Sequence, residues 1–227
     1  LKPLFIRYLF MKAAEITDNY IHFEKRNEYN FRDDDPLSST SMKNSNEANL
    51  YFLAVIPPEP ILSECQAHKD HFFEKYNSKA SLNSPPHVTV HMPFKLKEVK
   101  EPQLIDEVDN TIANIEPFQL QLNGYDHFGQ RVIYVMVEDS EPLLNLFLEI
   151  RKMMKVNFNI FNADYKNRGF NPHITLAFRD LKREAFKQAW PEFENATYKK
   201  SFDVSSLGLL KHDGKKWQVL KAFSFRN

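Results

Sequence analysis

The feature that most constrains the fold of this chain is an internal duplication. The stretch PHVTV at 86–90 returns as PHITL at 172–176, so His87 and Thr89 have counterparts in His173 and Thr175. Further matches are PEPIL at 58–62 with SEPLL at 140–144, FQLQLNG at 118–124 with FDVSSLG at 202–208, and HFG at 127–129 with HDG at 212–214. All lie 82 to 86 residues apart. We therefore interpret 49–128 and 131–225 as two copies of one supersecondary unit.

Each copy shows the pattern strand, helix, strand, helix, strand. The expected strands are 50–56, 87–92, 117–125, 131–138, 172–178, 199–210 and 216–225. The expected helices are 59–77, 101–115, 141–157 and 181–192. Helices covering one face of a sheet are typical of an α+β fold. We expect a bilobal fold in which two β-α-β-α-β units, related by a pseudo-twofold axis, line a central cleft with antiparallel sheets.

Composition excludes several classes of protein. Of 227 residues, 42% are hydrophobic, which is enough for a sizeable core. The 30 basic and 30 acidic residues cancel, which argues against broad coating of a nucleic-acid backbone. The single cysteine, Cys65, excludes an intramolecular disulfide and makes a cysteine-based zinc site improbable. A reducing compartment fits best, so the cytoplasm is the expected location.

The N-terminal part differs from the duplicated part. Residues 32–49 are polar, acidic and rich in Ser and Asn, which indicates a linker or disorder. We expect 1–48 to be a disordered or poorly packed leader and 49–227 to be the functional domain. No apolar run approaches the roughly 20 residues that span a bilayer, so no membrane association is expected.

The two His-x-Thr pairs carry a specific chemistry. Side chains alternate along a strand, so each His and its Thr share one face while Val88 and Val90 point to the other. Displacement at a phosphodiester needs an attacking and a leaving oxygen in line. Free histidine titrates near pH 6.5, so one ring can take a proton from water while the other gives one to the leaving oxygen. Each Thr hydroxyl can donate to a non-bridging oxygen. This scheme requires no metal or cofactor.

These motifs resemble the paired H-x-[ST]-x signatures of the two-histidine (2H) phosphoesterases, specifically the 2′-5′ RNA ligase-like branch. The similarity covers about 49–226 and includes the first strand, LYFLAVIPP at 50–58. The resemblance implies a bilobal α+β fold and metal-independent hydrolysis of 2′,3′-cyclic phosphate or 2′-5′-linked ends of RNA or nucleotides. It implies reverse 2′-5′ ligation as well. It implies His173 as the base toward water and His87 as the acid, although pseudo-symmetry lets these roles exchange.

Other residues are candidates for substrate binding. Arg131 opens the second copy and could grip a phosphate, or be a solvated strand end. Phe94 and Phe170 border the motifs and could stack on bases, although core packing is the favoured explanation for either one alone. Arg168, with Tyr165 and Lys166, lies on the loop before the second motif, where it could hold substrate.

His91 shares the expected face of the first motif but has Ala177 as its counterpart, which favours a histidine at the edge of the cleft over a catalytic one. A metal site of His87, His91 and His173 lacks a carboxylate or thiol at a matching spacing. We therefore expect no metal site.

Three other functions remain open. The chain could be an RNA-end binding module with little turnover, a phosphodiesterase for 2′-5′ oligoadenylate or another small cyclic phosphate, or a structural domain with relic motifs. We expect a monomer that acts on RNA ends or small nucleotides, and the sequence leaves the oligomeric state open.

Overall fold

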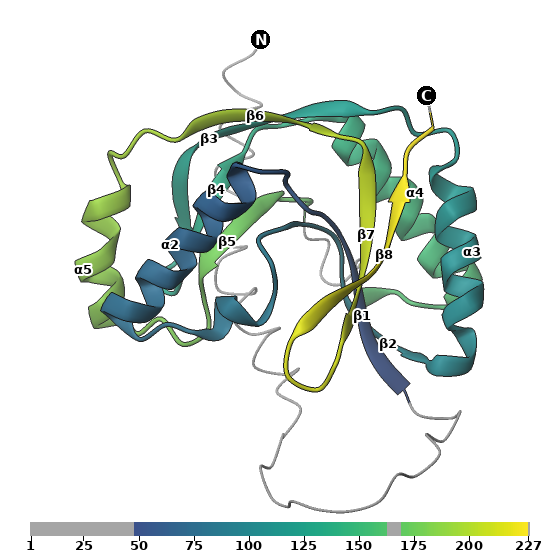
Figure 1. Cartoon of the computed structure of the whole chain (residues 1–227), viewed down its shortest axis with the longest axis horizontal. Helices are drawn as coiled ribbons and strands as arrows, with labels where there is room; N and C mark the ends of the chain where they lie inside the picture. The colour runs from purple at the N-terminus through teal and green to yellow at the C-terminus, as the bar shows by residue number, and fades with distance from the viewer. Residues whose placement is uncertain (1–47, 163–168, 227) are drawn as a thin grey trace, which may run out of the picture. The chain divides into compact units, whose positions relative to one another are not determined.

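The computed structural model describes residues 48–162 and 169–226 (Figure 1). The expected leader, except for its last residue, and the loop residues Tyr165, Lys166 and Arg168 lie outside the described residues. The strands are β1 (Ala48–Val55), β2 (Val88–Lys97), β3 (Phe118–Phe128), β4 (Val132–Val137), β5 (His173–Ala177), β6 (Lys199–Val204), β7 (Ser206–His212) and β8 (Trp217–Ser224). The α-helices are α2 (Ile61–Tyr76), α3 (Glu101–Ile112), α4 (Glu141–Phe158) and α5 (Arg183–Phe193), with 3-10 turns η1 (Ala80–Asn83) and η2 (Glu98–Lys100).

The eight strands form one antiparallel sheet in the order β6-β3-β4-β5-β2-β1-β7-β8. The centre, between β5 and β2, is joined through a single register pair, Val88 with Ile174. Each half takes strands from both sequence copies, because β3 pairs with β4 and β7 pairs with β1. This reciprocal exchange is what a pseudo-twofold axis through the centre requires. The expected α+β class with antiparallel strands is confirmed, with the two sheets joined into one.

The expected strand at 199–210 is wrong in one respect, because it is two strands separated at Ser205. β6 pairs with β3 in one half of the sheet, whereas β7 pairs with β1 in the other half. The chain therefore crosses from one half to the other at Ser205, as the arch of β6 leading into β7 shows (Figure 1).

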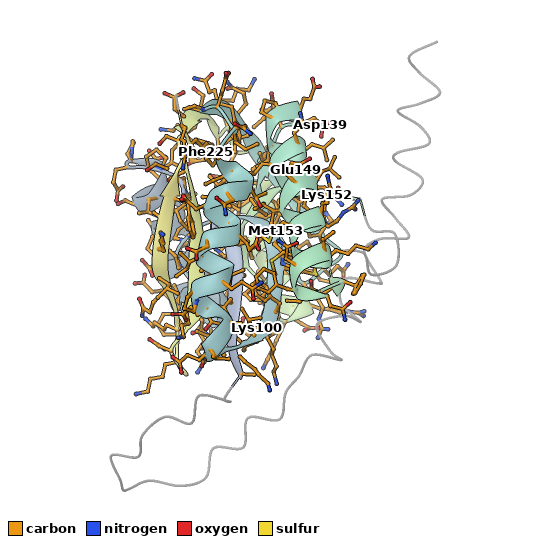
Figure 2. All side chains as sticks on the ribbon, turned by 90° about the vertical axis from the view of Figure 1, so that its right-hand side faces the viewer. Lys100, Asp139, Glu149, Lys152, Met153 and Phe225 are labelled. Carbon is orange, nitrogen blue, oxygen red and sulfur yellow. The ribbon has the colours of Figure 1, made fainter. Side chains whose placement is uncertain are left out.

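The helices form two pairs. α2 and α5 lie at one side and α3 and α4 at the other (Figure 1), and a perpendicular view shows α3 and α4 side by side (Figure 2). α4 is capped at its N-terminus by Ser140, whose hydroxyl accepts a hydrogen bond from the Leu143 amide, and at its C-terminus by Asn159 in the left-handed conformation. Its buried residues recur at helical spacing: Leu143, Leu146, Ile150, Met153 and Met154.

The two faces of the sheet differ. The main core packs between the sheet and the helices and includes Val88 and Ile174, both fully buried. A small second cluster of Phe52, Ala54 and Leu210 lies apart from it. Because Phe52 and Ala54 alternate with the core residues of β1, this cluster lies on the opposite face, which we call the open face. No helix among residues 48–162 and 169–226 is long and apolar enough to cross a membrane.

Candidate active site

The two His-x-Thr motifs meet at the centre of the sheet. Val88 pairs with Ile174 in antiparallel register, so His87 lies opposite Thr175 and Thr89 lies opposite His173. Val88 and Ile174 point into the main core, so their four neighbours point to the open face. All four are half-buried. The site is thus a quartet of two imidazoles and two hydroxyls arranged diagonally across one strand junction.

Both imidazoles are held in the same way. The Nδ1 of His87 lies 2.7 Å from the Pro85 carbonyl oxygen, and the Nδ1 of His173 lies 2.8 Å from the Asn171 carbonyl oxygen. A carbonyl only accepts, so Nδ1 carries the proton in each ring. In the neutral imidazole Nε2 then has a free electron pair. Each histidine is therefore fixed as the tautomer that can take a proton through Nε2.

Aromatic rings support both histidines at equivalent positions. The ring centre of Phe52 in β1 lies 4.8 Å from the ring centre of His87. The ring centre of Tyr134 in β4 lies 4.9 Å from the ring centre of His173. Phe52 and Tyr134 are 82 residues apart, which is within the offset between the sequence copies. The ring centre of Phe128 lies 5.0 Å from that of His173, and the ring centre of Trp217 lies 4.6 Å from that of Phe52. These contacts restrict both imidazole rings in orientation.

Burial lowers the pKa of both histidines. For His87, burial, then the Lys69 ammonium and then His173 lower the pKa to about 3, against the Pro85 carbonyl, which raises it. For His173, burial lowers the pKa and the Asn171 carbonyl raises it. Both rings are neutral at pH 7 without a bound anion. A bound phosphate favours the charged form of a neighbouring imidazole, and would let one ring hold a proton.

The expected place of His91 is wrong. The register of β2 shifts at Val90, because Thr89 pairs with Ala54 and His91 pairs with Leu53. This bulge breaks the alternation and turns His91 toward the main core, where it is 1% exposed and lies 5.3 Å from the ring centre of Phe94. His91 is therefore not at the edge of the open face.

The remaining candidates lie in different environments. Arg131 is half-buried in the turn between β3 and β4, next to the strand end that brings Phe128 to His173. Phe94 is 4% exposed and stacks with Tyr51, which fits core packing. Phe170 stacks with Phe147 of α4 at 4.3 Å, which fits core packing as well. Arg168 lies outside the described residues, so its contacts stay a prediction.

The part of the chain that the structure describes contains no group of three or more His, Cys, Asp or Glu side chains that could bind a metal ion.

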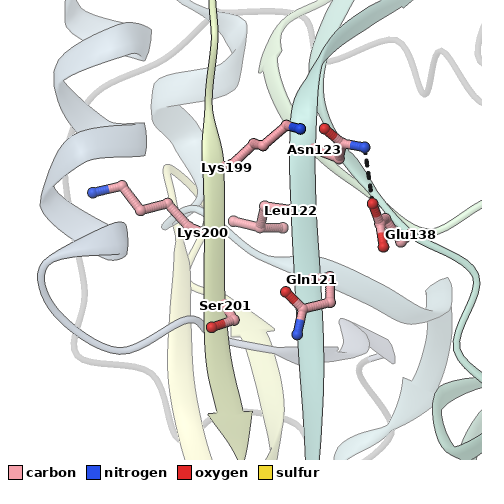
Figure 3. A pocket seen from close by; sticks show the side chains of 7 residues that line it. All are labelled: Gln121, Leu122, Asn123, Glu138, Lys199, Lys200 and Ser201. Carbon is pink, nitrogen blue, oxygen red and sulfur yellow. Dashed lines mark hydrogen bonds between the residues drawn. The ribbon is translucent and has the colours of Figure 1, made fainter.

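A hollow of about 250 Å³ lies over β3 and β6 (Figure 3). Gln121, Asn123 and Lys199 line it, and Asn123 donates a 2.8 Å hydrogen bond to Glu138. It contains neither His-x-Thr motif, so it is separate from the quartet.

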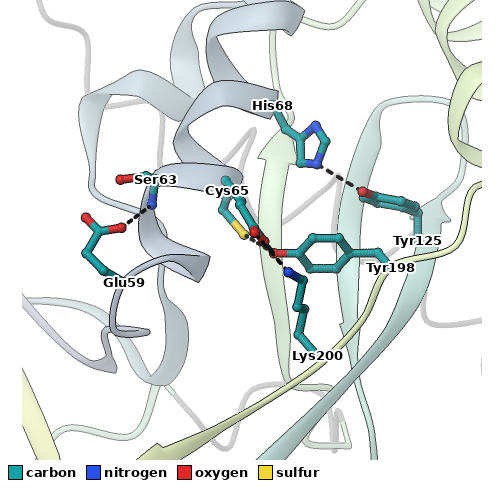
Figure 4. A network of polar contacts seen from close by, with 8 residues as sticks. Glu59, Ser63, Cys65, His68, Tyr125, Tyr198 and Lys200 are labelled. Atoms are coloured by element: carbon teal, nitrogen blue, oxygen red, sulfur yellow. Dashed lines mark hydrogen bonds and ion pairs between the residues drawn. The ribbon is translucent and has the colours of Figure 1, made fainter.

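A polar network fixes α2 to the sheet on the helix side (Figure 4). The Tyr198 hydroxyl donates to Glu64 at 2.8 Å, and Lys200 donates to the other oxygen of Glu64 at 2.9 Å. His68 and Tyr125 share a 2.9 Å hydrogen bond. This network holds the helix that precedes the first motif.

Asp180 links the segment that follows the second motif to the segment that precedes the first motif. It follows β5, and its carboxylate accepts bonds from the Ser78 hydroxyl and the Lys79 and Ala80 amides at 2.8 to 2.9 Å. The segment after the second motif thereby holds the segment before the first.

Three residues of this environment were not predicted from the sequence: Phe52, Tyr134 and Lys69. Phe52 and Tyr134 occupy matched positions in the two copies, so the offset of 82 could have identified them. Lys69 occupies a core position of α2, in the series Ile61, Cys65, Lys69, Phe72. A lysine in an apolar helical series is the signal that could have drawn attention to it.

Comparisons with known proteins identify the family to which the chain belongs. The family model of the 2′-5′ RNA ligase superfamily matches residues 57–216, which is more than half of the chain. A protein of Geobacillus sp. (strain WCH70), provisionally named a phosphoesterase, is 25% identical over 76% of this chain and 94% of its own length. A protein of Staphylococcus aureus (strain Newman) with the same provisional name is 25% identical over 75% of this chain and 96% of its own.

Two solved structures share the fold. TT0787 of Thermus thermophilus superposes with a TM-score of 0.61, at 22% identity, over 79% of this chain and 98% of that chain. LigT of E. coli superposes with a TM-score of 0.55, at 20% identity, over 80% of this chain and 100% of that chain. The family and the names of the relatives indicate an enzyme of phosphoesterase or ligase type. The chain belongs to the 2′-5′ RNA ligase superfamily, within the two-histidine phosphoesterases.

Proposed function

We propose that this protein hydrolyses 2′,3′-cyclic phosphate ends of RNA or nucleotides by general acid and base catalysis of His87 and His173, without a metal. The observation that carries the proposal is the register pair of Val88 with Ile174, which gathers both His-x-Thr motifs on the open face. A module that only binds RNA ends has no need of two titrating groups held as the same tautomer at equivalent positions.

The chemistry follows from this arrangement. One neutral imidazole takes a proton from water through Nε2 as the new oxygen–phosphorus bond forms. The bond from phosphorus to a ribose oxygen breaks, and the other imidazole, protonated beside the anionic phosphate, gives its proton to that oxygen. Thr89 and Thr175 donate to the non-bridging oxygens, where negative charge accumulates. If a 5′-hydroxyl replaces water as the attacking group and the bond from phosphorus to the 3′-oxygen breaks, the same site would join a 2′-5′ linkage, and the reverse of that step would cleave one.

The ligands of one structural neighbour support the substrate class. LigT of E. coli has been crystallised with 3′-AMP, with phosphate, with ATP and with NADP+. Opening of a 2′,3′-cyclic adenosine phosphate at its 2′-oxygen yields 3′-AMP. A nucleotide end is therefore the substrate proposed for the present chain.

The first test is turnover of an oligoribonucleotide that ends in a 2′,3′-cyclic phosphate, with EDTA present. We expect opening to a single monophosphate isomer at an unchanged rate in EDTA, because the proposed proton transfers use only protein groups. The isomer, read by chromatography against 2′- and 3′-phosphate standards, identifies the leaving oxygen. Inhibition by EDTA would contradict the mechanism. Turnover of 2′-5′ oligoadenylate alone would move the proposal to that substrate, and tight binding without turnover of any substrate would favour the RNA-end binding module.

Removal of either threonine hydroxyl should have a moderate effect. Thr89→Val and Thr175→Val each lose one hydrogen bond to a charged oxygen, which stabilises the transition state by about 1.5–3 kcal/mol, so kcat/KM should fall by about ten- to a hundredfold. The matched controls, Thr89→Ser and Thr175→Ser, keep the hydroxyl and should stay within about tenfold of the parent. Equal losses in the Val and Ser variants would show that packing of the methyl group, rather than the hydroxyl, is what matters.

A further inference from the structure

Trp217 is a half-buried tryptophan on the open face, on the side of the first motif. It is the first residue of β8 and packs against the open-face cluster of Phe52, Ala54 and Leu210. The ring centre of Phe52 lies 4.6 Å from that of Trp217 and 4.8 Å from that of His87. A single phenyl ring therefore touches both the indole and the imidazole.

Two rings contact the indole at nearly a right angle. The plane of Phe52 makes an angle of 81° with that of Trp217. His212, the register partner of Trp217 in β7, makes an angle of 75° at a ring-centre distance of 5.0 Å. Neither ring therefore lies flat on a face of the indole. Nucleobases stack flat on aromatic side chains in single-stranded nucleic-acid sites, and the indole is oriented for such a contact.

The two halves of the open face differ in polarity beside the motif histidines. Phe52 and Tyr134 each touch one of these histidines. The register partner of Phe52 is Leu210, so this pair is apolar. The register partner of Tyr134 is Asp126, whose carboxylate accepts a 3.2 Å hydrogen bond from the Tyr134 hydroxyl. A carboxylate repels phosphate groups and offers no apolar surface to a base. The half that contains Phe52 is therefore the more favourable place for a nucleoside.

Other aromatic residues near the motifs are less suited to hold a base. Phe94 is 4% exposed, and Phe170 stacks on a ring of α4 at 4.3 Å. Phe128 packs on Tyr134, with ring centres 4.4 Å apart, in the half that carries the carboxylate. Trp217 combines a large aromatic ring with an apolar surface that leads to the first motif.

We propose that Trp217 is a specificity-determining residue that stacks on the base of the terminal nucleotide, while the cyclic phosphate lies at the quartet and the ribose lies over Phe52. The inference rests on the proposed function for the identity of the phosphate. In a nucleotide one ribose separates the base from the phosphate, and in the protein one phenyl ring touches both the indole and the imidazole of His87. Every base has a flat aromatic face, so Trp217 selects nucleotides over other cyclic phosphates without choosing among the bases.

The place of the base also sets the direction of the displacement. With the ribose on the side of His87, the leaving ribose oxygen lies on that side and the attacking water lies opposite, on the side of His173. His173 then takes a proton from water through Nε2 as the oxygen–phosphorus bond forms. The bond to the ribose oxygen breaks, and His87 gives its Nε2 proton to that oxygen. These roles agree with those that the family resemblance implies.

The direct test uses the fluorescence of the two tryptophans, Trp190 and Trp217. Trp190 belongs to α5 and stacks with Phe186, so it is away from the open face. In Trp190→Phe all emission comes from Trp217, and we expect a nucleoside 3′-monophosphate to quench it through the stacked base. Inorganic phosphate, which has no base, should not quench it. In Trp217→Phe the remaining emission of Trp190 should not respond to either compound.

A second arm measures specificity. A nucleoside 2′,3′-cyclic phosphate is compared with methyl ribofuranoside 2′,3′-cyclic phosphate, which has the same reacting group and no base. Trp217→Leu keeps an apolar side chain that cannot stack, so the ratio of kcat/KM between the two substrates should fall by about ten- to a hundredfold, mainly through KM of the nucleotide. Trp217→Phe keeps an aromatic ring and should lose less of this ratio. Phe128→Leu, on the other half of the open face, should retain it.

Three results would overturn the proposal: an unchanged ratio in a folded Trp217→Leu variant, loss of the ratio in Phe128→Leu instead, or no quenching of Trp217 at nucleotide concentrations that calorimetry shows to saturate the site. Binding of the nucleotide no tighter than inorganic phosphate would overturn it as well. If Trp217→Leu does not fold, quenching in Trp190→Phe still decides.

Failure of the proposed function is seen separately, because quenching needs no turnover. Absence of hydrolysis with the quenching of Trp217 intact would refute the proposed function and leave a nucleotide-binding site. Hydrolysis with a ratio that does not depend on Trp217 would refute the inference alone.

Discussion

His87→Ala and His173→Ala should each lower kcat on a 2′,3′-cyclic phosphate by about a hundred- to ten-thousandfold, because each removes a proton transfer from the transition state. The double variant should be little worse than the single ones, since the two groups act in one concerted displacement and their losses do not add. Single-turnover rates at saturating substrate measure the effect on chemistry directly. Circular dichroism of each variant shows whether the fold is kept.

The matched control is His71→Ala. His71 belongs to α2, is partly exposed, and pairs with Glu192 of α5 at 2.9 Å, on the helix side of the sheet. Its loss removes a histidine and a surface contact without reaching the open face, so kcat should stay within about twofold, as is usual for substitutions away from a site. If His87→Ala retained as much activity as His71→Ala, the quartet would not be the catalytic centre.

The duplication explains why so much of the site could be predicted. Period-2 alternation placed His87 with Thr89 and His173 with Thr175, and the equal position of the motifs in both copies predicted that they meet. The structure brings them together through one pair of apolar residues that separate each His from its Thr. The helices could be predicted for a similar reason, since their apolar residues recur at helical spacing over three or more turns.

What could not be predicted depends on partners distant in sequence. Nothing in the residues around Ser205 marks a break, because the break arises from β6 and β7 joining different halves of the sheet. The bulge at Val90 is a property of the pairing of β2 with β1, so the alternation rule misplaced His91. Lys69 looks like an ordinary helix lysine until the carbonyls of Ser81 and Ser84 are seen to accept from its ammonium.

Ile174→Ala should be among the most destabilising single substitutions outside the proposed catalytic groups. Ile174 is fully buried and pairs with Val88 on one side and Val135 on the other, so it fills the only junction between the halves of the described sheet. Truncation there leaves a cavity between strands that are fixed on both sides, and the free energy of unfolding should fall by about 2–5 kcal/mol. Urea denaturation followed by fluorescence of the two tryptophans measures the change.

Leu144→Ala provides the comparison, because Leu144 is 42% exposed on α4 and its truncation should change the free energy of unfolding by about 0.5 kcal/mol or less. The same junction residue that stabilises the sheet stands between His173 and Thr175, so stability and the proposed catalysis depend on one strand pair. A loss for Ile174→Ala as small as that for Leu144→Ala would mean that the halves are held together elsewhere. The register that unites the two motifs would then lack the packing that is needed to hold the four proposed catalytic groups in place.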